Sequence, residues 1–360
     1  MAVLHPSAPS PLPKIAPTLI AALEGAGWHV TQTFWGGRRP HESWLVKVLS
    51  RSRELVMALV QLGVREDAVL FVNSSHSWRG IARDVPLVLG ARSLGHRSLV
   101  LWHGSDPDSV TACRHSPFAI GSAMLSRCAD AILVLSASEL SGWRRALPQG
   151  RFFHVTNPYV AKMPRASRAN DGVCRVLFVG RVMRAKGIFE LLEAFGRLSE
   201  AHACTLSVVG DGPDTSAVAE WIACRGLTEV VDMPGYLDEE SLVQRYMEAD
   251  IFVLPSYSEG FPTVLSEAMD TGLPIVTTAC GGMADHLEEG VNCLFVPAGD
   301  AAGLEAALDR LMDSPELRVC MGAANRIKVK TFAPEVVIRQ YLRALEYVTW
   351  RSRVGPLRRS

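Results

Sequence analysis

Two carboxylates and a predicted helix start form the stretch of this chain best suited to chemistry. Glu259 lies in a polar turn after an apolar run, and Glu267 follows about two turns later in a helix. That helix should begin at Pro262, because proline has no N–H to lose in a first helical turn. The backbone N–H groups expected to point out of this start belong to Phe261, Thr263 and Val264. Such a group of donors favours an anion, for example a phosphate.

The two glutamates favour a different chemical group. A carboxylate beside a phosphate would repel it, so Glu259 and Glu267 are better suited to accepting hydrogen bonds from neutral hydroxyls. A transferred sugar and a ribose both carry such hydroxyls. The stretch therefore predicts a nucleotide-sugar site, with phosphate at the helix start, Glu259 on the sugar and Glu267 on the ribose.

Two cations follow another predicted strand. The apolar run 173–179 should be buried, and Arg181 and Lys186 straddle the turn after it. Both side chains can therefore face one ligand. A pyrophosphate leaving group needs this neutralisation, and charge-assisted hydrogen bonds contribute about 1.5 to 3 kcal/mol each.

The first half of the chain has the pattern of a doubly wound α/β domain. A strand-like run at 28–35 ends before Gly36 and Gly37, and an amphipathic segment follows at about 41–61. A later strand at 98–102 ends in His103. Ligand contacts in such folds lie at the carboxyl ends of parallel strands, so His103 is a candidate donor to an oxygen of the ligand.

These motifs together resemble the GT-B glycosyltransferases, in particular their large retaining family 4. The matching strings are Glu259-Gly260-Phe261-Pro262, Leu265-Ser266-Glu267-Ala268-Met269 and Gly180-Arg181 followed by Lys186-Gly187. The resemblance extends over about residues 28–348 of the printed sequence. It implies an α/β protein of the GT-B fold, with two doubly wound Rossmann-like domains facing each other across a cleft. It also implies a retaining mechanism without a metal or a cofactor, the nucleotide-sugar being a co-substrate.

The resemblance assigns roles to individual residues. The catalytic candidates are His103, Glu259, Arg181 and Lys186. The donor-binding candidates are Gly36, Gly37, Arg181, Lys186, Met233, Glu259, Gly260, Phe261, Thr263, Val264 and Glu267. His103 would reach toward the transferred sugar, and Met233 would lie at the nucleobase. The chain departs from the family at Ala284 and Asp285, where Pro and Glu are more usual, so the sugar contact of that loop is left open.

The length of 360 residues predicts two domains. The expected divisions are a disordered Pro-rich extension (1–20), an N-terminal acceptor-side Rossmann-like domain (21–162), a linker (163–172), a C-terminal nucleotide-sugar-binding Rossmann-like domain (173–334), and a helix crossing back to the N-domain with a basic tail (335–360).

Charge and cysteine content narrow the class of protein. The formal net charge is zero, which argues against a nucleic-acid-binding protein. Residues 1–165 nevertheless carry 18 Lys and Arg against 10 Asp and Glu, and the remainder carry 19 against 27. The basic first half or the basic C-terminal tail could therefore contact an anionic membrane. Eight scattered cysteines without a Cys-x-x-Cys pair indicate a cytoplasmic protein, with peripheral contact at the inner face of the plasma membrane as a further expectation.

The expected partners are a nucleoside-diphosphate sugar and a glycan or lipid-linked acceptor, with no nucleic acid. Family membership points to bacterial cell-surface polysaccharide synthesis. Two alternatives stay open from the sequence, namely a sugar-nucleotide epimerase of the same fold and a non-catalytic GT-B binding module. A phosphorylase is disfavoured, because its cofactor-binding lysine motif is not found.

Overall fold

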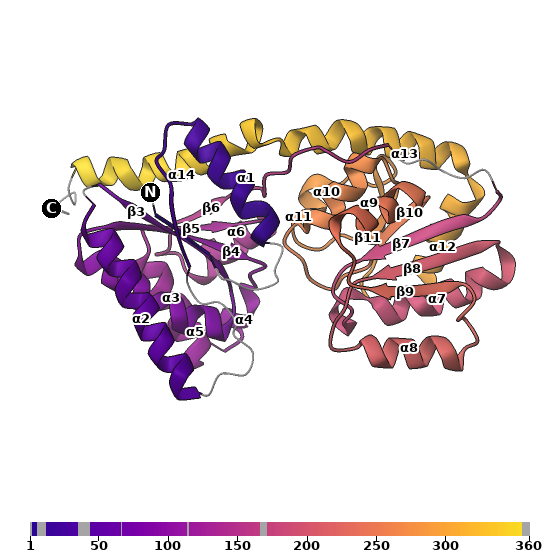
Figure 1. The fold of residues 1–360 in the computed structure, drawn as a ribbon, viewed down its shortest axis with the longest axis horizontal. Helices are drawn as coiled ribbons and strands as arrows, with labels where there is room; N and C mark the ends of the chain where they lie inside the picture. The colour runs from indigo at the N-terminus through magenta and orange to yellow at the C-terminus, as the bar shows by residue number, and fades with distance from the viewer. Residues whose placement is uncertain are drawn as a thin grey trace. The chain divides into compact units, whose positions relative to one another are not determined.

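A computed structural model describes residues 2–5, 12–34, 44–65, 67–113, 115–165 and 171–354. Gly36 and Gly37 lie outside these residues. The described chain divides into two compact units (Figure 1). The first unit contains the chain up to Pro158 together with the last helix from Pro334, and the second runs from Tyr159 to Ala333.

The first unit is built on a parallel sheet in the order β2-β1-β3-β4-β5-β6. Its strands are β1 (Ala2–His5), β2 (Thr31–Phe34), β3 (Val69–Ser75), β4 (Arg97–His103), β5 (Ala131–Val134) and β6 (Phe152–His154). Its helices are α1 (Leu12–Gly25), α2 (Trp44–Gly63), α3 (Trp78–Ser93), α4 (Asp108–Thr111), α5 (Pro117–Cys128), α6 (Ala137–Ala146) and α14 (Pro334–Val354).

Helices cover both faces of this first sheet. One apolar core joins the sheet to α1 and α14, and the other joins it to α2, α3, α5 and α6. Strand β5, residues 69–72 of β3 and residues 99–102 of β4 are entirely apolar, because both faces of these central strands are covered. The last helix supplies Val337, Tyr341 and Leu345 to the core of the first unit.

The start of the chain differs from the expected disordered extension. Strand β1 pairs with β2 and β3, and α1 buries Ile15, Leu19 and Leu23. These three residues recur every fourth position and so form one apolar helix face. The prolines of this segment had suggested disorder, but Pro17 lies inside α1.

The expected linker also begins inside the second unit. Asp270 of that unit accepts hydrogen bonds from the backbone N–H groups of Lys162 and Met163, at 2.8 and 2.7 Å, and from the hydroxyl of Tyr159 at 3.2 Å. The side chain of Met163 is buried. The division between the units therefore falls after Pro158, several residues before the polar stretch that marked it in the sequence.

The second unit has a parallel sheet in the order β12-β11-β10-β7-β8-β9. Its strands are β7 (Cys174–Val179), β8 (Cys204–Val209), β9 (Val231–Gly235), β10 (Ile251–Leu254), β11 (Ile275–Thr278) and β12 (Cys293–Val296). Its helices are α7 (Ile188–Ala201), α8 (Thr215–Cys224), α9 (Glu239–Glu248), α10 (Thr263–Thr271), α11 (Gly282–His286), α12 (Ala301–Asp313) and α13 (Pro315–Lys328), with short 3-10 turns η1 (Arg184–Lys186) and η2 (Val329–Phe332).

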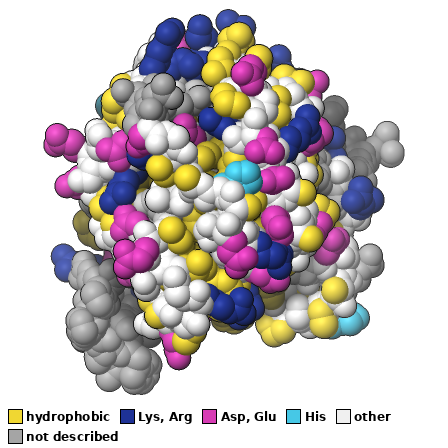
Figure 2. All heavy atoms as spheres, turned by 90° about the vertical axis from the view of Figure 1, so that its right-hand side faces the viewer, with side chains coloured by type: hydrophobic (Ala, Val, Ile, Leu, Met, Phe, Trp, Pro, Cys, Tyr) yellow, Lys and Arg dark blue, Asp and Glu magenta, His cyan; other side chains and the backbone are white. Residues whose placement is uncertain are grey.

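The surface in Figure 2 carries basic and acidic side chains that are interspersed. Within the described residues, no helix is both long enough and apolar enough to cross a membrane.

Candidate functional site

The candidate site lies where the strand order of the second sheet reverses. The chain forms β7, β8 and β9 in one direction across the sheet, and then returns to place β10, β11 and β12 on the other side of β7. Neighbouring β7 and β10 are thus the two strands whose connections diverge. In open parallel sheets, ligands bind beyond the carboxyl ends of such a strand pair. Arg181 and Lys186 follow β7, and Glu259 follows β10, so the sequence-predicted residues converge on this position.

The turns at this sheet edge pack directly on one another through glycines. Gly187 has a φ of +70°, and a Cβ at this position would lie 2.2 Å from the carbonyl oxygen of Pro255. A Cβ on Gly212 would lie 2.0 Å from the carbonyl oxygen of Val182. Only glycine permits these backbone approaches. The turns after β7, β8 and β10 are therefore held in fixed contact.

Lys186 and Glu259 form an ion pair across this edge. Their side chains are 21% and 13% exposed, so the pair is largely shielded from water. The sequence had placed Lys186 on phosphate and Glu259 on sugar hydroxyls, as separate contacts. The structure joins the two side chains, so a ligand of either one would lie beside the other.

Ser256 and Thr278 support this ion pair, and the sequence analysis did not identify either residue. The fully buried Ser256 hydroxyl is 3.1 Å from Glu259 Oε1 and donates to it. The hydroxyl of Thr278 donates to the carbonyl oxygen of Ser256 at 2.5 Å. The Pro-Ser dipeptide after β10 was visible in the sequence, but the link to the end of β11 depends on the order of the strands.

The loop after β11 closes against the turn that carries Glu259. The N–H of Gly282 donates to the carbonyl oxygen of Gly260 at 2.6 Å. Gly281 has a φ of +53°, and a Cβ there would lie 1.7 Å from the carbonyl oxygen of Glu259. The loop whose sugar contact was left open in the sequence analysis is thus in backbone contact with Glu259 and Gly260.

Helix α10 begins one residue later than expected. Pro262 occupies the N-cap position with an extended backbone, and α10 starts at Thr263. Proline offers no side-chain acceptor, and no side-chain cap is found at this helix start within the described residues. The N–H of Leu265 bonds to the carbonyl oxygen of Pro262 at 3.1 Å. The N–H groups of Thr263 and Val264 precede the first intrahelical bond, as a phosphate site requires.

Phe261 contributes to this site by packing. Its ring is 4% exposed and contacts the rings of Phe332 and His286, with centroid distances of 4.9 and 4.8 Å. The apolar side chain therefore anchors the turn before α10, and its role toward a ligand is confined to its backbone.

Glu267 is 6% exposed and has a partner that the sequence did not indicate. The hydroxyl of the fully buried Tyr246, from α9, donates to Glu267 Oε2 at 3.0 Å and lies 3.3 Å from the carbonyl oxygen of Val264. Burial, reinforced by the neighbouring Glu267, raises the pKa of Tyr246 well above its usual value. The hydroxyl therefore stays protonated, and it fixes the carboxylate relative to the start of α10.

Arg181 and Met233 differ in how firmly they are held. Arg181 is exposed, and its side chain makes no hydrogen bond or ion pair with the described residues. Met233 is half-buried against the core of the second unit, on β9 at the edge of the sheet. The β8–β9 register shifts between Ser207 and Val209, so Met233 lies opposite an irregular part of the ladder.

His103 belongs to the first unit, at the carboxyl end of β4. One of its ring nitrogens is hydrogen-bonded to the side-chain oxygen of Asn73, near the carboxyl end of the neighbouring β3. Burial lowers the pKa of His103 to about 4, so the ring is neutral at pH 7. A neutral imidazole bonded through one nitrogen has the other available for a ligand.

Glu139 holds the turn after His103, and the sequence analysis did not identify it. Its buried carboxylate accepts from the N–H groups of Ser105 and Leu135 at 2.8 and 2.9 Å. The indole N–H of Trp143 donates to the Ser105 hydroxyl at 2.9 Å. The string Ser136-Ala137-Ser138-Glu139 resembles a capping box and could have marked this glutamate as structural.

The family match falls on the second unit. Residues 161–328 match the family described as Glycosyl transferases group 1. The amylovoran biosynthesis glycosyltransferase AmsK of Erwinia amylovora is 33% identical over 180 residues, which are 48% of this chain and 44% of that protein. A glycogen synthase of Mycobacterium tuberculosis is 27% identical over 229 residues, 63% of this chain and 51% of that one. The chain thus spans about half the length of the curated relatives that it matches.

Solved structures match nearly the whole chain. Sucrose-phosphate synthase from Thermosynechococcus elongatus superposes with a TM-score of 0.76 at 21% identity, covering 96% of this chain and 98% of that one. HepE from Anabaena, in complex with UDP and glucose, superposes with a TM-score of 0.75 at 14% identity, covering 96% and 99%. These likenesses show the GT-B fold, with two Rossmann-like parallel-sheet units.

Proposed function

We propose that this protein is a retaining glycosyltransferase of family 4. It moves a sugar from a nucleoside-diphosphate sugar to a glycan or lipid-linked acceptor in bacterial cell-surface polysaccharide synthesis. The observation that carries the proposal is the Lys186–Glu259 ion pair, which lies at the strand-order reversal of the second sheet. A nucleotide-sugar site needs a cation for the pyrophosphate and an acceptor for the sugar hydroxyls at one place. Lys186 supplies the first of these groups and Glu259 the second.

The second unit provides the donor contacts in this proposal. Lys186, Arg181 and the first N–H groups of α10 bind the pyrophosphate, which gains negative charge as the sugar departs. Glu267, held by Tyr246, accepts from the ribose hydroxyls. The backbone near Met233 holds the base. Arg181 is free to move onto the phosphates because none of the described side chains pairs with it.

Glu259 is bonded to Lys186 in the structure and is proposed to bind a sugar hydroxyl as well. It is paired with Lys186 here, and a pyrophosphate would draw the ammonium toward itself. The carboxylate would then keep its bond from Ser256 and accept from a sugar hydroxyl with its remaining lone pairs. His103, neutral at pH 7, contributes a hydrogen bond to the transferred sugar.

The relatives suggest the acceptor class. AmsK is named for amylovoran biosynthesis, and a Salmonella typhimurium relative is named as a putative colanic acid biosynthesis glycosyltransferase. These are names of other proteins, and they support a polysaccharide product here. The proposal includes a cytoplasmic location, independence of metal ions, and contact with an anionic membrane through the basic first half or the C-terminal tail.

A donor-turnover assay tests the reaction class. The full chain is incubated with UDP-, GDP- and ADP-sugars and lipid-linked acceptors in the presence of a chelator, and product anomers are assigned by NMR. We expect one donor series to release its nucleoside diphosphate. The new glycosidic bond should have the same anomeric configuration as the sugar had in the donor. Glu267→Ala should chiefly weaken donor binding, and His103→Ala should chiefly reduce turnover. An inverted product anomer would contradict the retaining mechanism, and product formed without any acceptor would favour an epimerase.

A further inference from the structure

The outer faces of three helices of the first unit expose many large apolar side chains. Helices α2, α3 and α5 lie side by side on one face of the sheet, with α3 in contact with both others (Figure 1). Their inner faces fill the core. Exposed large hydrophobic residues on these helices and their ends are Val56, Met57, Val60, Val64, Trp78, Leu89, Leu94, Ile120 and Met124. We call this set the outer apolar face.

The spacing of these residues produces continuous stripes. Val56 and Val60 of α2, and Val64 directly after it, recur every four residues and are 57%, 56% and 79% exposed. On α5, Ile120 and Met124 are also four apart. Residues at this spacing share one side of a helix, so each helix has an apolar side toward the core and another toward solvent. Contiguous apolar patches larger than roughly a few hundred Å² are rare on monomeric proteins and mark interaction sites.

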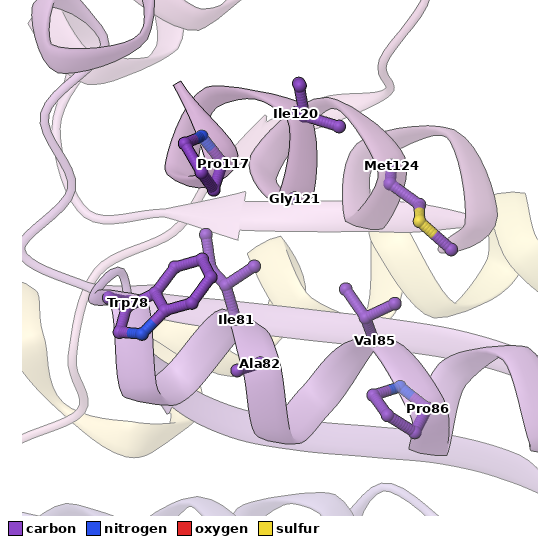
Figure 3. A pocket seen from close by; sticks show the side chains of 9 residues that line it. All are labelled: Trp78, Ile81, Ala82, Val85, Pro86, Pro117, Ile120, Gly121 and Met124. Carbon is purple, nitrogen blue, oxygen red and sulfur yellow. The ribbon is translucent and has the colours of Figure 1, made fainter. Parts of the chain in front are cut away.

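Two shallow grooves run along α3. The first, of about 400 Å³, lies between α3 and α5, where Ile81 forms part of its lining (Figure 3). The second, of about 460 Å³, lies between α2 and α3. Glycines bring the helices close enough to form them. A Cβ on Gly121 would lie 2.7 Å from Ile81, and one on Gly90 would lie 2.6 Å from Leu59.

The first groove is open on its solvent side and almost entirely apolar. Val85 on α3 and Met124 on α5 point toward each other, and Trp78 and Ile120 belong to the same lining (Figure 3). Trp78 is 55% exposed at the end of the groove. An indole combines an apolar ring with one N–H donor, which suits it to the boundary between lipid and water.

The charges on these helices have one predominant sign. The three helices carry seven basic residues and two acidic ones, Glu54 and Asp84. Both acidic side chains are already paired with an arginine of the same helix, Glu54 with Arg51 and Asp84 with Arg83. The three helices therefore carry a net positive charge, and neither of their two acidic side chains is free.

Unpaired arginines extend the stripes. Arg53 precedes Val56 by three residues on α2, and Arg127 follows Met124 by three on α5. Arg79 is next to Trp78. All three are exposed, and within the part of the chain that is described none of them forms an ion pair. Cations bordering an apolar surface favour an anionic lipid interface.

We propose that the outer apolar face of α2, α3 and α5 docks on the surface of an anionic bilayer. Val60, Trp78 and Ile120 enter the boundary between headgroups and acyl chains, and Arg53, Arg79 and Arg127 contact lipid phosphates. The proposal assigns the membrane contact to this face instead of the C-terminal tail. The reason for such docking, access to a lipid-linked acceptor, rests on the proposed function. The membrane binding itself requires neither a nucleotide nor a transfer reaction.

Vesicle flotation of the full chain tests the docking surface. We expect binding to vesicles with about 30% phosphatidylglycerol to be at least about tenfold stronger than to pure phosphatidylcholine, and to be lost in about 0.5 M salt. Ile120→Glu and Val60→Glu should each weaken binding at least about tenfold, since each removes a buried aliphatic group and adds repulsion. Arg358→Gln combined with Arg359→Gln in the tail should leave it unchanged.

A matched control separates this face from general surface hydrophobicity. Ile327 of α13, in the second unit, is 70% exposed, and Ile327→Glu should bind vesicles as the wild type does. Quenching by brominated lipid should fall in Trp78→Phe. Thermal unfolding checks that each variant is folded, and Ile120→Ser serves if Ile120→Glu is not.

Three results would overturn the proposal. The first is a wild type that fails to bind anionic vesicles. The second is equal binding by the Ile120→Glu and Ile327→Glu variants. The third is a wild-type dimer, seen by sedimentation velocity, that Ile120→Glu dissociates while vesicle binding persists, because this face would then join two copies. Each result leaves the nucleotide-binding tests of the second unit unaffected.

Discussion

The two units share one architecture and use it differently. In the second unit, the turns at the carboxyl edge of the sheet are packed on each other, as Gly187 on Pro255 and Gly281 on Glu259 illustrate. In the first unit, the described part of the corresponding edge is held by Glu139 and Trp143, while apolar side chains gather on the outer helices. A site held by backbone contacts tolerates few residue types, and an outer helix face tolerates many. The comparison therefore contrasts a rigid sheet edge, proposed for the donor, with an outer helix face, proposed for the membrane.

The largest effect should come from the ion pair of the second unit. Lys186→Ala removes a cation from the departing pyrophosphate and leaves Glu259 without its partner. We expect kcat/KM for donor and acceptor to fall by about 10² to 10³, the range found when one charge-stabilising donor is removed from an active site. Steady-state kinetics measure this. An unchanged kcat/KM would show that the pair is only structural.

Loop packing gives the next effect. Gly281→Ala places a methyl group against the carbonyl oxygen of Glu259 and should reduce donor affinity about tenfold or more, because the turn must shift. Gly290→Ala is the matched control, since Gly290 also has a positive φ but no atom within 4 Å of an added Cβ. Calorimetric titration with the nucleotide compares them. If both variants lost the same nucleotide affinity, the cause would be backbone strain alone and not the contact with Glu259.

The first unit should instead respond to pH through its half-buried histidines. His76 is enclosed by Trp102, Phe118 and Trp143, and burial lowers its pKa to about 4. The unfolded chain binds more protons between pH 6.5 and 4, so stability falls as pH decreases through this window. At pH 5 the loss relative to pH 7 should be about 2 kcal/mol from His76.

Urea unfolding of His76→Phe at both pH values measures this contribution. The difference in the free energy of unfolding between pH 7 and pH 5 should be about 2 kcal/mol smaller in the variant than in the wild type. Trp143→Phe, in the same cluster, should be destabilised equally at both values because neither ring titrates. An identical pH dependence in wild type and His76→Phe would contradict the assignment.

The smallest effect concerns the orientation of Glu267. Tyr246→Phe removes one hydrogen bond to the carboxylate and should raise KM for the donor about three- to tenfold with little change in kcat, because one such bond contributes about 1 kcal/mol. Phe252, stacked on the Tyr246 ring, gives a control in Phe252→Leu, which should lower stability without this KM change. A fall in kcat alone would assign Tyr246 a different role.

The sequence motifs predicted one site in the second unit, and the structure brings several of its residues to one sheet edge because they follow β7 and β10, which are neighbours in the sheet. Arg181, Lys186 and Glu259 converge for that reason. Tyr246 and Ser256 escaped prediction because their contacts depend on the packing of α9 against α10 and of the end of β11 against the turn after β10. The expected disorder of 1–20 was wrong for the described residues, since the spacing of Ile15, Leu19 and Leu23 outweighs the prolines of that segment.

The outer apolar face could not be recognised from periodicity alone. A helix with apolar residues on two sides has no single polar face, and the sequence does not say which side faces the sheet. Only the positions of α2 and α5 beside α3 show that Val60 and Ile120 are exposed. The roles of Gly36 and Gly37 stay predictions, because both lie outside the described residues.

The central claim is that the strand-order reversal of the second sheet binds a nucleoside diphosphate. Isothermal titration of UDP, GDP and ADP into the full chain, and into Lys186→Ala and Glu267→Ala, tests it most directly. Glu305→Ala is the control, because Glu305 pairs with Arg197 away from this edge. The account predicts that one nucleotide binds the wild type and Glu305→Ala alike, and binds the other two variants at least about tenfold more weakly. Binding of no nucleotide, or equal binding by all four proteins, would contradict it.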